Sequence, residues 1–304
     1  MCKVKNKITM NSILQLSSIS IQGHGGVTLS ADRLGNSKDP AVIMLHGGGQ
    51  TRYSWRTAAE AIAQNGFDVM TVDLRGHGES GWCEQGDYTL TALKCDLVCV
   101  MQELGKPAAL IGFSMGGIIS LLTASDPQLN SLCSAVVVVD IGLRPEKKGV
   151  DRILEFMHGN SAGFASLEDA AESIAKYQPG KKRPVSVEGL SKNLRLKEDG
   201  RYYWHWDPRF VARPGDSSKM DEYYSSITQS ASHIKVPCML VRGARSDIVS
   251  DESVEEFLQY IPHAEYVNVS GASHRVAAER NTAFTQAALA FLSKTFALEN
   301  DGGT

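Results

Sequence analysis

The chain has 304 residues, a formal net charge of −3, and a hydrophobic content of 42%. This length suffices for one large core, or for one core with an inserted subdomain. The small net charge argues against nucleic acid as the main partner, and residues 8–21 are too polar for a signal peptide or a membrane span.

The six cysteines show no metal-ligand spacing and accompany no secretory signal. We therefore expect reduced thiols, a cytoplasmic protein and no membrane partner. The sequence indicates nothing about the oligomeric state.

The first predicted element is a β-hairpin at residues 18–32, where two strands flank the Gly-rich tetrapeptide 23–26. Continuous apolar runs then replace the alternating pattern, as is typical of strands buried on both faces. Alternation of such strands with helices predicts a mostly parallel sheet with helices on both faces. The strands are predicted at residues 41–45, 68–72, 108–113, 135–139, 238–241 and 265–269, and the helices at 53–64, 89–104, 115–124, 253–260 and 277–296.

The strand–helix alternation stops between residues 140 and 236. This stretch contains two helical patterns, at residues 150–158 and 167–177, and an aromatic cluster near residues 202–206. We interpret it as an inserted, mainly helical cap. The predicted boundaries are an N-terminal extension at 1–16, a core at 17–140 and 236–298, the cap at 141–235, and a C-terminal tail at 299–304.

The apolar strand predicted at residues 108–113 ends in Gly112-Phe113-Ser114-Met115-Gly116, and an apolar helix pattern follows at once. A Gly-x-Ser-x-Gly motif between a strand and a helix is typical of a nucleophilic serine on a sharp turn. The glycines are expected because side chains there would collide with the neighbouring strand and helix. Ser114 is therefore the predicted nucleophile, at a helix N-terminus that favours negative charge.

A serine nucleophile needs a base and a carboxylate that orients the base. His274 follows the last predicted strand and Asp247 follows the strand at 238–241, so both are expected at the same sheet edge as Ser114. The chain order Ser114, Asp247, His274 is one of the known triad orders. Asp140, at the end of the strand at 135–139, is a competing carboxylate, for which a hydrogen-bonding role at the cap entry is the alternative.

His46-Gly47-Gly48-Gly49 follows the strand at 41–45, where glycines allow close backbone approach. We predict that the N–H groups of Gly48 and Met115 stabilise an oxyanion. His46 is expected to hold the loop rather than react. The glycine spacing does not fit a dinucleotide or phosphate loop, and His205 has no second histidine at ligand spacing, so neither a cofactor nor a metal is expected.

These motifs resemble the α/β-hydrolase superfamily, in the branch with a serine nucleophile and an inserted helical cap. The resemblance implies an eight-stranded sheet. It also implies that Arg75 and His77 belong to a structural loop and that Trp55 packs the first helix. Ser114 replaces the aspartate of the members that cleave epoxides or carbon–halogen bonds. The matching segments, in family order, are residues 45–50, 72–80, 112–117, 242–247 and 271–274.

The predicted function is cleavage of small-molecule carboxylic esters by a carboxylesterase-like enzyme. The same triad serves haloperoxidase-like perhydrolases, lactonases, thioesterases and carbon–carbon bond hydrolases, which the sequence does not separate. A non-enzymatic small-molecule receptor is the alternative from another class. Phe113, Trp204 and Trp206 are the predicted substrate contacts, although the aromatic cluster could instead pack the cap onto the sheet.

Overall fold

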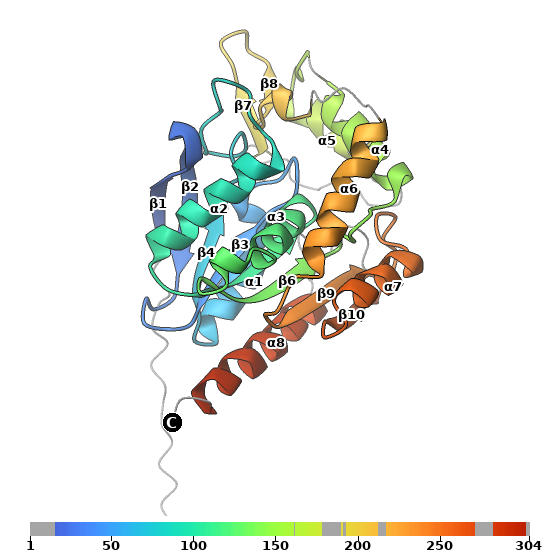
Figure 1. Cartoon of the computed structure of the whole chain (residues 1–304). Coiled ribbons are helices and arrows are strands. Elements are labelled where there is room, and N and C mark those ends of the chain that lie inside the picture. Colours follow the sequence, from blue (N-terminus) through green and yellow to red (C-terminus); the bar gives the residue numbers. More distant parts are fainter. Residues whose placement is uncertain are drawn as a thin grey trace, which may run out of the picture.

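The computed structural model describes residues 16–160, 162–177, 190, 193–211, 217–270 and 282–301. Eight of the described strands form one sheet (Figure 1). The strands are β1 (Ser17–Gln22), β2 (Thr28–Leu34), β3 (Ala41–Leu45), β4 (Asp68–Val72), β5 (Ala108–Phe113), β6 (Cys133–Val139), β9 (Cys238–Gly243) and β10 (Glu265–Val269).

The order across the sheet is β1-β2-β4-β3-β5-β6-β9-β10. β2 pairs antiparallel with β1 and β4, and every other neighbouring pair is parallel. β3, β4 and β5 are buried at every position, which explains why their residues do not alternate in polarity. The predicted fold class is confirmed, including the opening hairpin.

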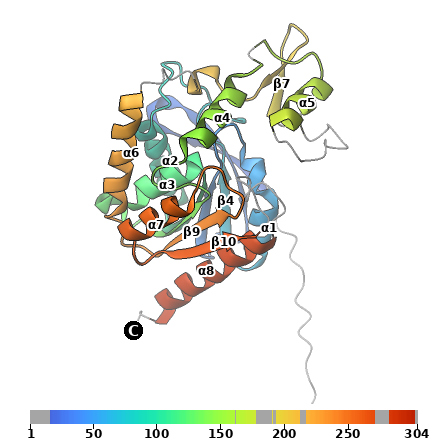
Figure 2. The same cartoon turned by 90° about the vertical axis from the view of Figure 1, so that its right-hand side faces the viewer.

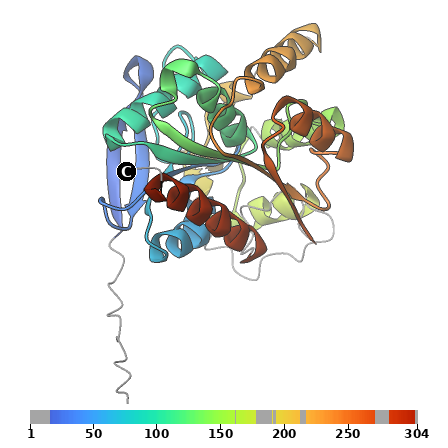
Figure 3. The same ribbon diagram turned by 60° about the horizontal axis from the view of Figure 1, so that its bottom comes forward.

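Helices cover both faces of the sheet (Figure 3). On one face, Trp55 is completely buried, with its ring centroid 5.8 Å from that of Phe284. The face with Trp55 carries α1 (Arg56–Gln64) and α8 (Thr282–Asp301). The other face carries α2 (Leu90–Leu104), α3 (Met115–Ala124), α6 (Ser217–Ala231) and α7 (Asp251–Tyr260).

Of the helices that the structure describes, none has the length and apolar character to cross a membrane.

The segment between β6 and β9 divides into two parts. α4, α5 and the antiparallel pair β7–β8 lie together at one end of the molecule (Figures 1 and 2). α6 instead packs beside α3, where Ile227 and Ala231 join the main apolar core. The stretch predicted as a cap therefore also supplies one helix of the layer over the sheet. The other elements are α4 (Lys147–His158), α5 (Leu167–Tyr177), β7 (Leu194–Leu196) and β8 (Tyr202–Trp204).

The backbone leaves no room for side chains where β5 joins α3. A Cβ atom on Gly112 would lie 2.1 Å from the carbonyl oxygen of Gly116. One on Gly116 would lie 2.4 Å from the carbonyl oxygen of Leu45, at the end of β3. Because these neighbours are backbone atoms in buried elements, they cannot move aside. The ends of β3 and β5 and the start of α3 therefore touch directly.

This contact predicts the effect of Gly112→Ala. The added methyl group should destabilise the fold by about 3 kcal/mol or more, because backbone must shift to admit it. Gly81→Ala is the control, since a Cβ there meets its nearest neighbour at 3.4 Å, an ordinary contact, and should change stability by less than about 1 kcal/mol. Urea unfolding of both variants measures the difference, and equal stabilities would contradict the packing described here.

Candidate active site

Ser114 stands at the junction of β5 and α3 in a strained backbone conformation. Its φ is 51° and its ψ is −117°, a region that non-glycine residues rarely adopt. Two hydrogen bonds fix this turn: the Ser114 N–H donates to the Val139 carbonyl at 3.0 Å, and its own carbonyl accepts the Ile118 N–H at 3.1 Å. The Ser114 side chain forms no cap of α3. Strain of this kind is concentrated at functional sites.

The glycine loop after β3 lies against Ser114. A Cβ atom on Gly47 would lie 3.1 Å from the Cβ of Ser114. The Gln50 N–H donates to the Gly47 carbonyl at 3.1 Å and closes a turn in which Gly49 has a φ of +73°. Only glycine adopts that φ readily, so the turn depends on Gly49.

The two predicted oxyanion donors differ from the amides around them. The Gly47 N–H donates to Gln50 Oε1 at 3.3 Å, and the Gly49 N–H donates to His77 Nε2 at 3.1 Å. Within the described part of the chain, the Gly48 N–H between them forms no hydrogen bond. Met115 is the first residue of α3, so its N–H has no acceptor inside the helix. Among the described residues, neither amide has a hydrogen-bond acceptor.

His46 holds the glycine loop in place, as expected from the sequence. Its Nε2 accepts the Leu74 N–H at 3.0 Å, so the proton is on Nδ1, which lies 2.8 Å from the Gly47 carbonyl. Both nitrogens of a neutral imidazole are then satisfied. Burial lowers the pKa of His46 to about 4. His46 is therefore uncharged at neutral pH and serves the backbone.

His77 has the same neutral form and fixes Gly49. Because its Nε2 accepts the Gly49 N–H, its Nδ1 carries the proton, which faces the Arg75 carbonyl at 3.1 Å. Burial lowers the pKa of His77 to about 3. The rings of His77 and Phe210 are nearly perpendicular, with centroids 4.4 Å apart.

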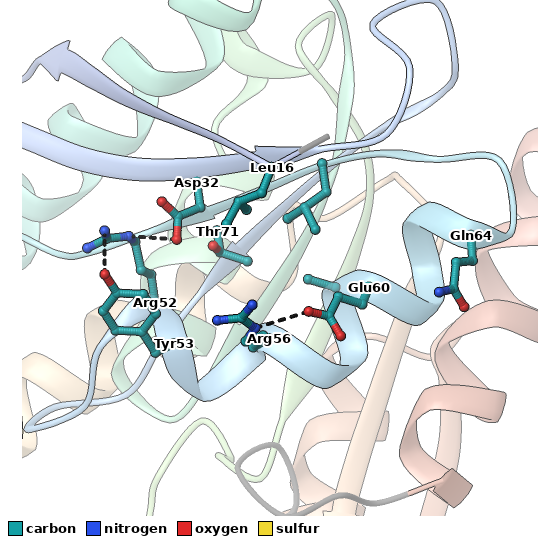
Figure 4. Close-up of a pocket in the computed structure, with 10 residues that line it drawn as sticks. Leu16, Asp32, Arg52, Tyr53, Arg56, Glu60, Gln64 and Thr71 are labelled. Carbon is teal, nitrogen blue, oxygen red and sulfur yellow. Dashed lines mark hydrogen bonds and ion pairs between the residues drawn. The ribbon is translucent and has the colours of Figure 1, made fainter. Parts of the chain in front are cut away.

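A buried ionic cluster supports the loop that contains His77. Arg52 pairs with Asp73, with Asp32 at 3.1 Å and with Glu79 at 2.5 Å. Burial raises the pKa of Asp73, although hydrogen bonds from Arg52 and Glu79 oppose the rise. Arg52 also borders a cavity of about 220 Å³ beside α1 (Figure 4). None of the predicted site residues lines that cavity.

Residues 205–209 are bound tightly to the loop at residues 76–88. His205 Nδ1 accepts the Gly78 N–H at 2.7 Å, and the Tyr88 hydroxyl donates to Asp207 Oδ2 at 2.5 Å. Arg209 donates to the Cys83 carbonyl at 2.9 Å. Burial lowers the pKa of His205 well below its usual value, so this contact is also made by a neutral ring.

Three side chains, which we call the apolar wall, lie over the glycine loop: Met157, Trp206 and Phe210. A Cβ on Gly48 would lie 3.5 Å from the Phe210 ring and 3.8 Å from the Met157 sulfur. A Cβ on Gly49 would lie 3.5 Å from the Trp206 ring. The sequence indicated only Trp206. In the sequence, Met157 lies in an amphipathic helix pattern and Phe210 lies just after the aromatic cluster. These two patterns were the signals that could have identified them.

The other two predicted substrate contacts, Trp204 and Phe113, pack in different apolar clusters. Trp204 is half-buried and stacks on Trp206, with centroids 4.8 Å apart and ring planes at 11°. Phe113 is buried in the apolar core on the α1 and α8 face, with its ring against Gly47. The structure gives Phe113 a packing role, and its contact with substrate stays a prediction.

Of the predicted base and acid, the structure describes only the acid. His274 lies outside the described residues. The Asp247 side chain is 40% exposed, and its carboxylate pairs with Arg152 of α4 at 2.6 Å. Asp140 is completely buried at the end of β6 and accepts hydrogen bonds from the Gly243 N–H and the Ser246 hydroxyl. The assignment of Asp247 as the acid stays a prediction.

Metal ligation finds no support in the described residues, where no group of three or more His, Cys, Asp or Glu side chains could hold an ion. The arrangement around Ser114 consists instead of a strained serine, two available amides and an apolar wall. Such a site suits attack on a carbonyl group.

The buried histidines predict a loss of stability in acid. Unfolded histidine binds a proton below pH ~6.5, whereas folded His46 does so only near pH 4. The unfolded state therefore binds more protons in this window, and stability falls as the pH drops from 6.5 through 4. His46 should account for about 3 kcal/mol of that loss. Denaturant unfolding of the wild type and of His46→Gln at pH 7 and pH 4 measures it, and equal pH dependence in the two proteins would refute it.

Comparison with known proteins gives matches along most of the chain. The family model described as alpha/beta hydrolase fold matches residues 40–280. Esterase Rv0045c of Mycobacterium tuberculosis is 28% identical over 270 residues, which cover 85% of this chain and 84% of the relative. The mouse sn-1-specific diacylglycerol lipase ABHD11 is 25% identical, over 85% of this chain and 83% of its own.

Solved structures agree with this result. The structure of the Mycobacterium tuberculosis esterase superposes with a TM-score of 0.73 at 25% identity, covering 92% of each chain. An E-2-(acetamidomethylene)succinate hydrolase reaches a TM-score of 0.78 at 20% identity, over 92% of this chain and 100% of its own, and this likeness concerns the fold alone. From the family match and the geometry around Ser114, we conclude that the chain belongs to the α/β-hydrolase fold family.

Proposed function

We propose that the protein is a serine hydrolase that cleaves carboxylic esters of small molecules through an acyl-enzyme on Ser114. The observation that carries the proposal is the strained Ser114 beside the amides of Gly48 and Met115, which have no hydrogen-bond acceptor among the described residues. A tetrahedral intermediate formed at Ser114 develops an oxyanion, and preorganised amides stabilise it. The two relatives that match over most of their length are named as an esterase and a lipase, which supports an ester as the substrate rather than another acyl compound.

In the proposed mechanism, His274 accepts the proton of Ser114 as the serine oxygen attacks the ester carbonyl. The amides of Gly48 and Met115 hold the resulting oxyanion, and the protonated base then gives its proton to the departing alcohol. Water repeats the two steps on the acyl-enzyme and releases the acid. An ionised carboxylate, for which the sequence offers Asp247 and Asp140, orients the base and remains charged.

The apolar wall supports a substrate with an apolar group beside its reacting carbonyl. Met157, Trp206 and Phe210 stand over the glycine loop that supplies one of the proposed oxyanion donors. An acyl group bound at that loop would lie against these side chains and bury apolar surface. Cytoplasmic action, as expected from the sequence, is consistent with the free thiols at the five described cysteines.

A substrate panel with the wild type and Ser114→Ala tests the proposal. We expect the wild type to hydrolyse p-nitrophenyl esters of short and medium acyl chains, with kcat/KM above that for a thioester, a lactone or peracid formation. Ser114→Ala should lower kcat by about 10,000-fold or more, because the nucleophile is lost. Ester turnover that survives Ser114→Ala would refute Ser114 as the nucleophile. A higher kcat/KM for the thioester or the lactone would show that this compound class, rather than simple esters, is the substrate.

Two substitutions of His77 test the role of the glycine loop. His77→Leu removes the acceptor of the Gly49 N–H and leaves a buried donor unsatisfied, which costs about 1–3 kcal/mol. The loosened loop should lower kcat for p-nitrophenyl butyrate roughly tenfold. His77→Gln supplies an amide oxygen in place of Nε2 and should retain kcat within about threefold. Equal kcat values in the two variants would show that the Gly49 contact does not position the oxyanion site.

A further inference from the structure

Two carboxylates stand near the carboxyl edge of the sheet, and their surroundings differ. Asp140 directly follows β6, and Asp247 lies in the loop after β9. From the sequence, either residue could orient a catalytic base, because both follow strands that end at this edge. Their packing, charge partners and backbone conformation distinguish them.

Asp140 is the neighbour of Ser114 on the adjacent strand. Phe113 of β5 pairs in register with Val139 of β6, so the next residues are Ser114 on one strand and Asp140 on the other. Both have left-handed backbone, with φ of 51° and 50°. Such conformations are costly for non-glycine residues and persist where the surrounding structure enforces them, often at reaction sites.

The Asp140 carboxylate is buried and held in one orientation. It is 0% exposed, its Oδ1 accepts the Gly243 N–H at 2.7 Å, and its Oδ2 accepts the Ser246 hydroxyl at 2.7 Å. In serine triads the carboxylate that orients the base is likewise buried and hydrogen-bonded.

Asp247 is arranged to hold α4. Its side chain is 40% exposed and pairs with Arg152 of that helix. The Glu146 N–H, just before α4, donates to the Ile248 carbonyl at 2.9 Å. A Cβ on Gly149 would lie 2.3 Å from the Asp247 carbonyl, so the helix touches this loop directly. Water and the arginine both weaken the field that Asp247 would exert on an imidazole.

We infer that Asp140 is the carboxylate that orients the base of the reaction at Ser114, and that Asp247 fastens α4 to the core through Arg152. The inference rests on the proposed function, because it assigns a partner to that catalytic base. During acylation the serine proton moves to the base while the bond from Ser114 Oγ to the carbonyl carbon forms. Asp140 keeps its charge and stabilises the protonated base. It is thus a positioning residue.

Labelling of Ser114 by a fluorophosphonate tests this inference without knowledge of the substrate. The serine oxygen attacks phosphorus, fluoride leaves, and the serine proton goes to the base, so the rate constant reports the activated serine. The wild type should be labelled, and Ser114→Ala should not. The same proteins are assayed with p-nitrophenyl butyrate, and their Tm values are recorded.

Asp140→Asn should lower both the labelling rate constant and kcat by about 1000- to 10,000-fold, with KM within about threefold of the wild type. The fold should tolerate the change, because Asn can accept the Gly243 N–H and donate to the Ser246 hydroxyl oxygen. Loss of the negative charge should also lower the pKa of the base. The acid limb of the rate profile should then move to lower pH by about one unit or more. A purely structural role would not move that limb.

Asp247→Asn should keep the labelling rate constant and kcat within about tenfold of the wild type, with the acid limb unmoved. Arg152→Met is the matched control. It should lower Tm as much as Asp247→Asn does, and the double variant should lower Tm no further, because both changes break one ion pair.

The opposite ranking, with a 1000-fold loss in Asp247→Asn and near-normal rates in Asp140→Asn, would overturn the inference. Should Asp140→Asn not fold, Asp247→Asn decides alone: rates within tenfold support the inference, and a 1000-fold loss at unchanged Tm overturns it. A wild type that is not labelled would overturn both this inference and the proposed function. If the wild type is labelled but hydrolyses no ester, only the proposed ester substrate is refuted. The labelling rate constants of Asp140→Asn and Asp247→Asn would still show which carboxylate orients the base.

Discussion

The direct backbone contact between the ends of β3 and β5 and the start of α3 is the constraint on which the site depends. It requires glycine at 112 and 116, and it forces Ser114 into a conformation that the chain would otherwise avoid. The same contact brings the glycine loop against Ser114. The strained serine and its two amides are therefore consequences of one packing arrangement, which rigid buried strands can maintain.

Neutral histidines connect this arrangement to the loop at residues 74–78. His46 and His77 each accept one backbone N–H and face one carbonyl, so they act as rigid spacers between chain segments. Their burial favours the uncharged form, and only that form can accept an N–H. The positions of His46 and His77 near Ser114 are thus explained without any part in proton transfer.

The sheet and the position of Ser114 could be predicted because their signals are local. Apolar runs, their spacing and Gly-x-Ser-x-Gly depend on neighbours within a few residues. The apolar wall could not be derived in this way, since Met157 and Phe210 meet Gly48 only through tertiary packing. The packing of α6 on α3 was missed for the same reason. Asp140 and Asp247 both follow strands that end at the same sheet edge. The structure separates them by burial, backbone conformation, hydrogen bonds and the Arg152 contact.

Gly78 bonds to the segment after β8 through its N–H and to Arg195 of β7 through its carbonyl. The peptide group of Gly49 is in turn fixed by His77, one residue earlier in the same loop. Residues 205–210 and the glycine loop are therefore parts of a single rigid frame. Substitutions in this frame that are meant to change substrate specificity would therefore disturb the reaction as well as substrate binding. The tolerant positions should lie in α5 and on the outer faces of β7 and β8, away from these shared peptide groups.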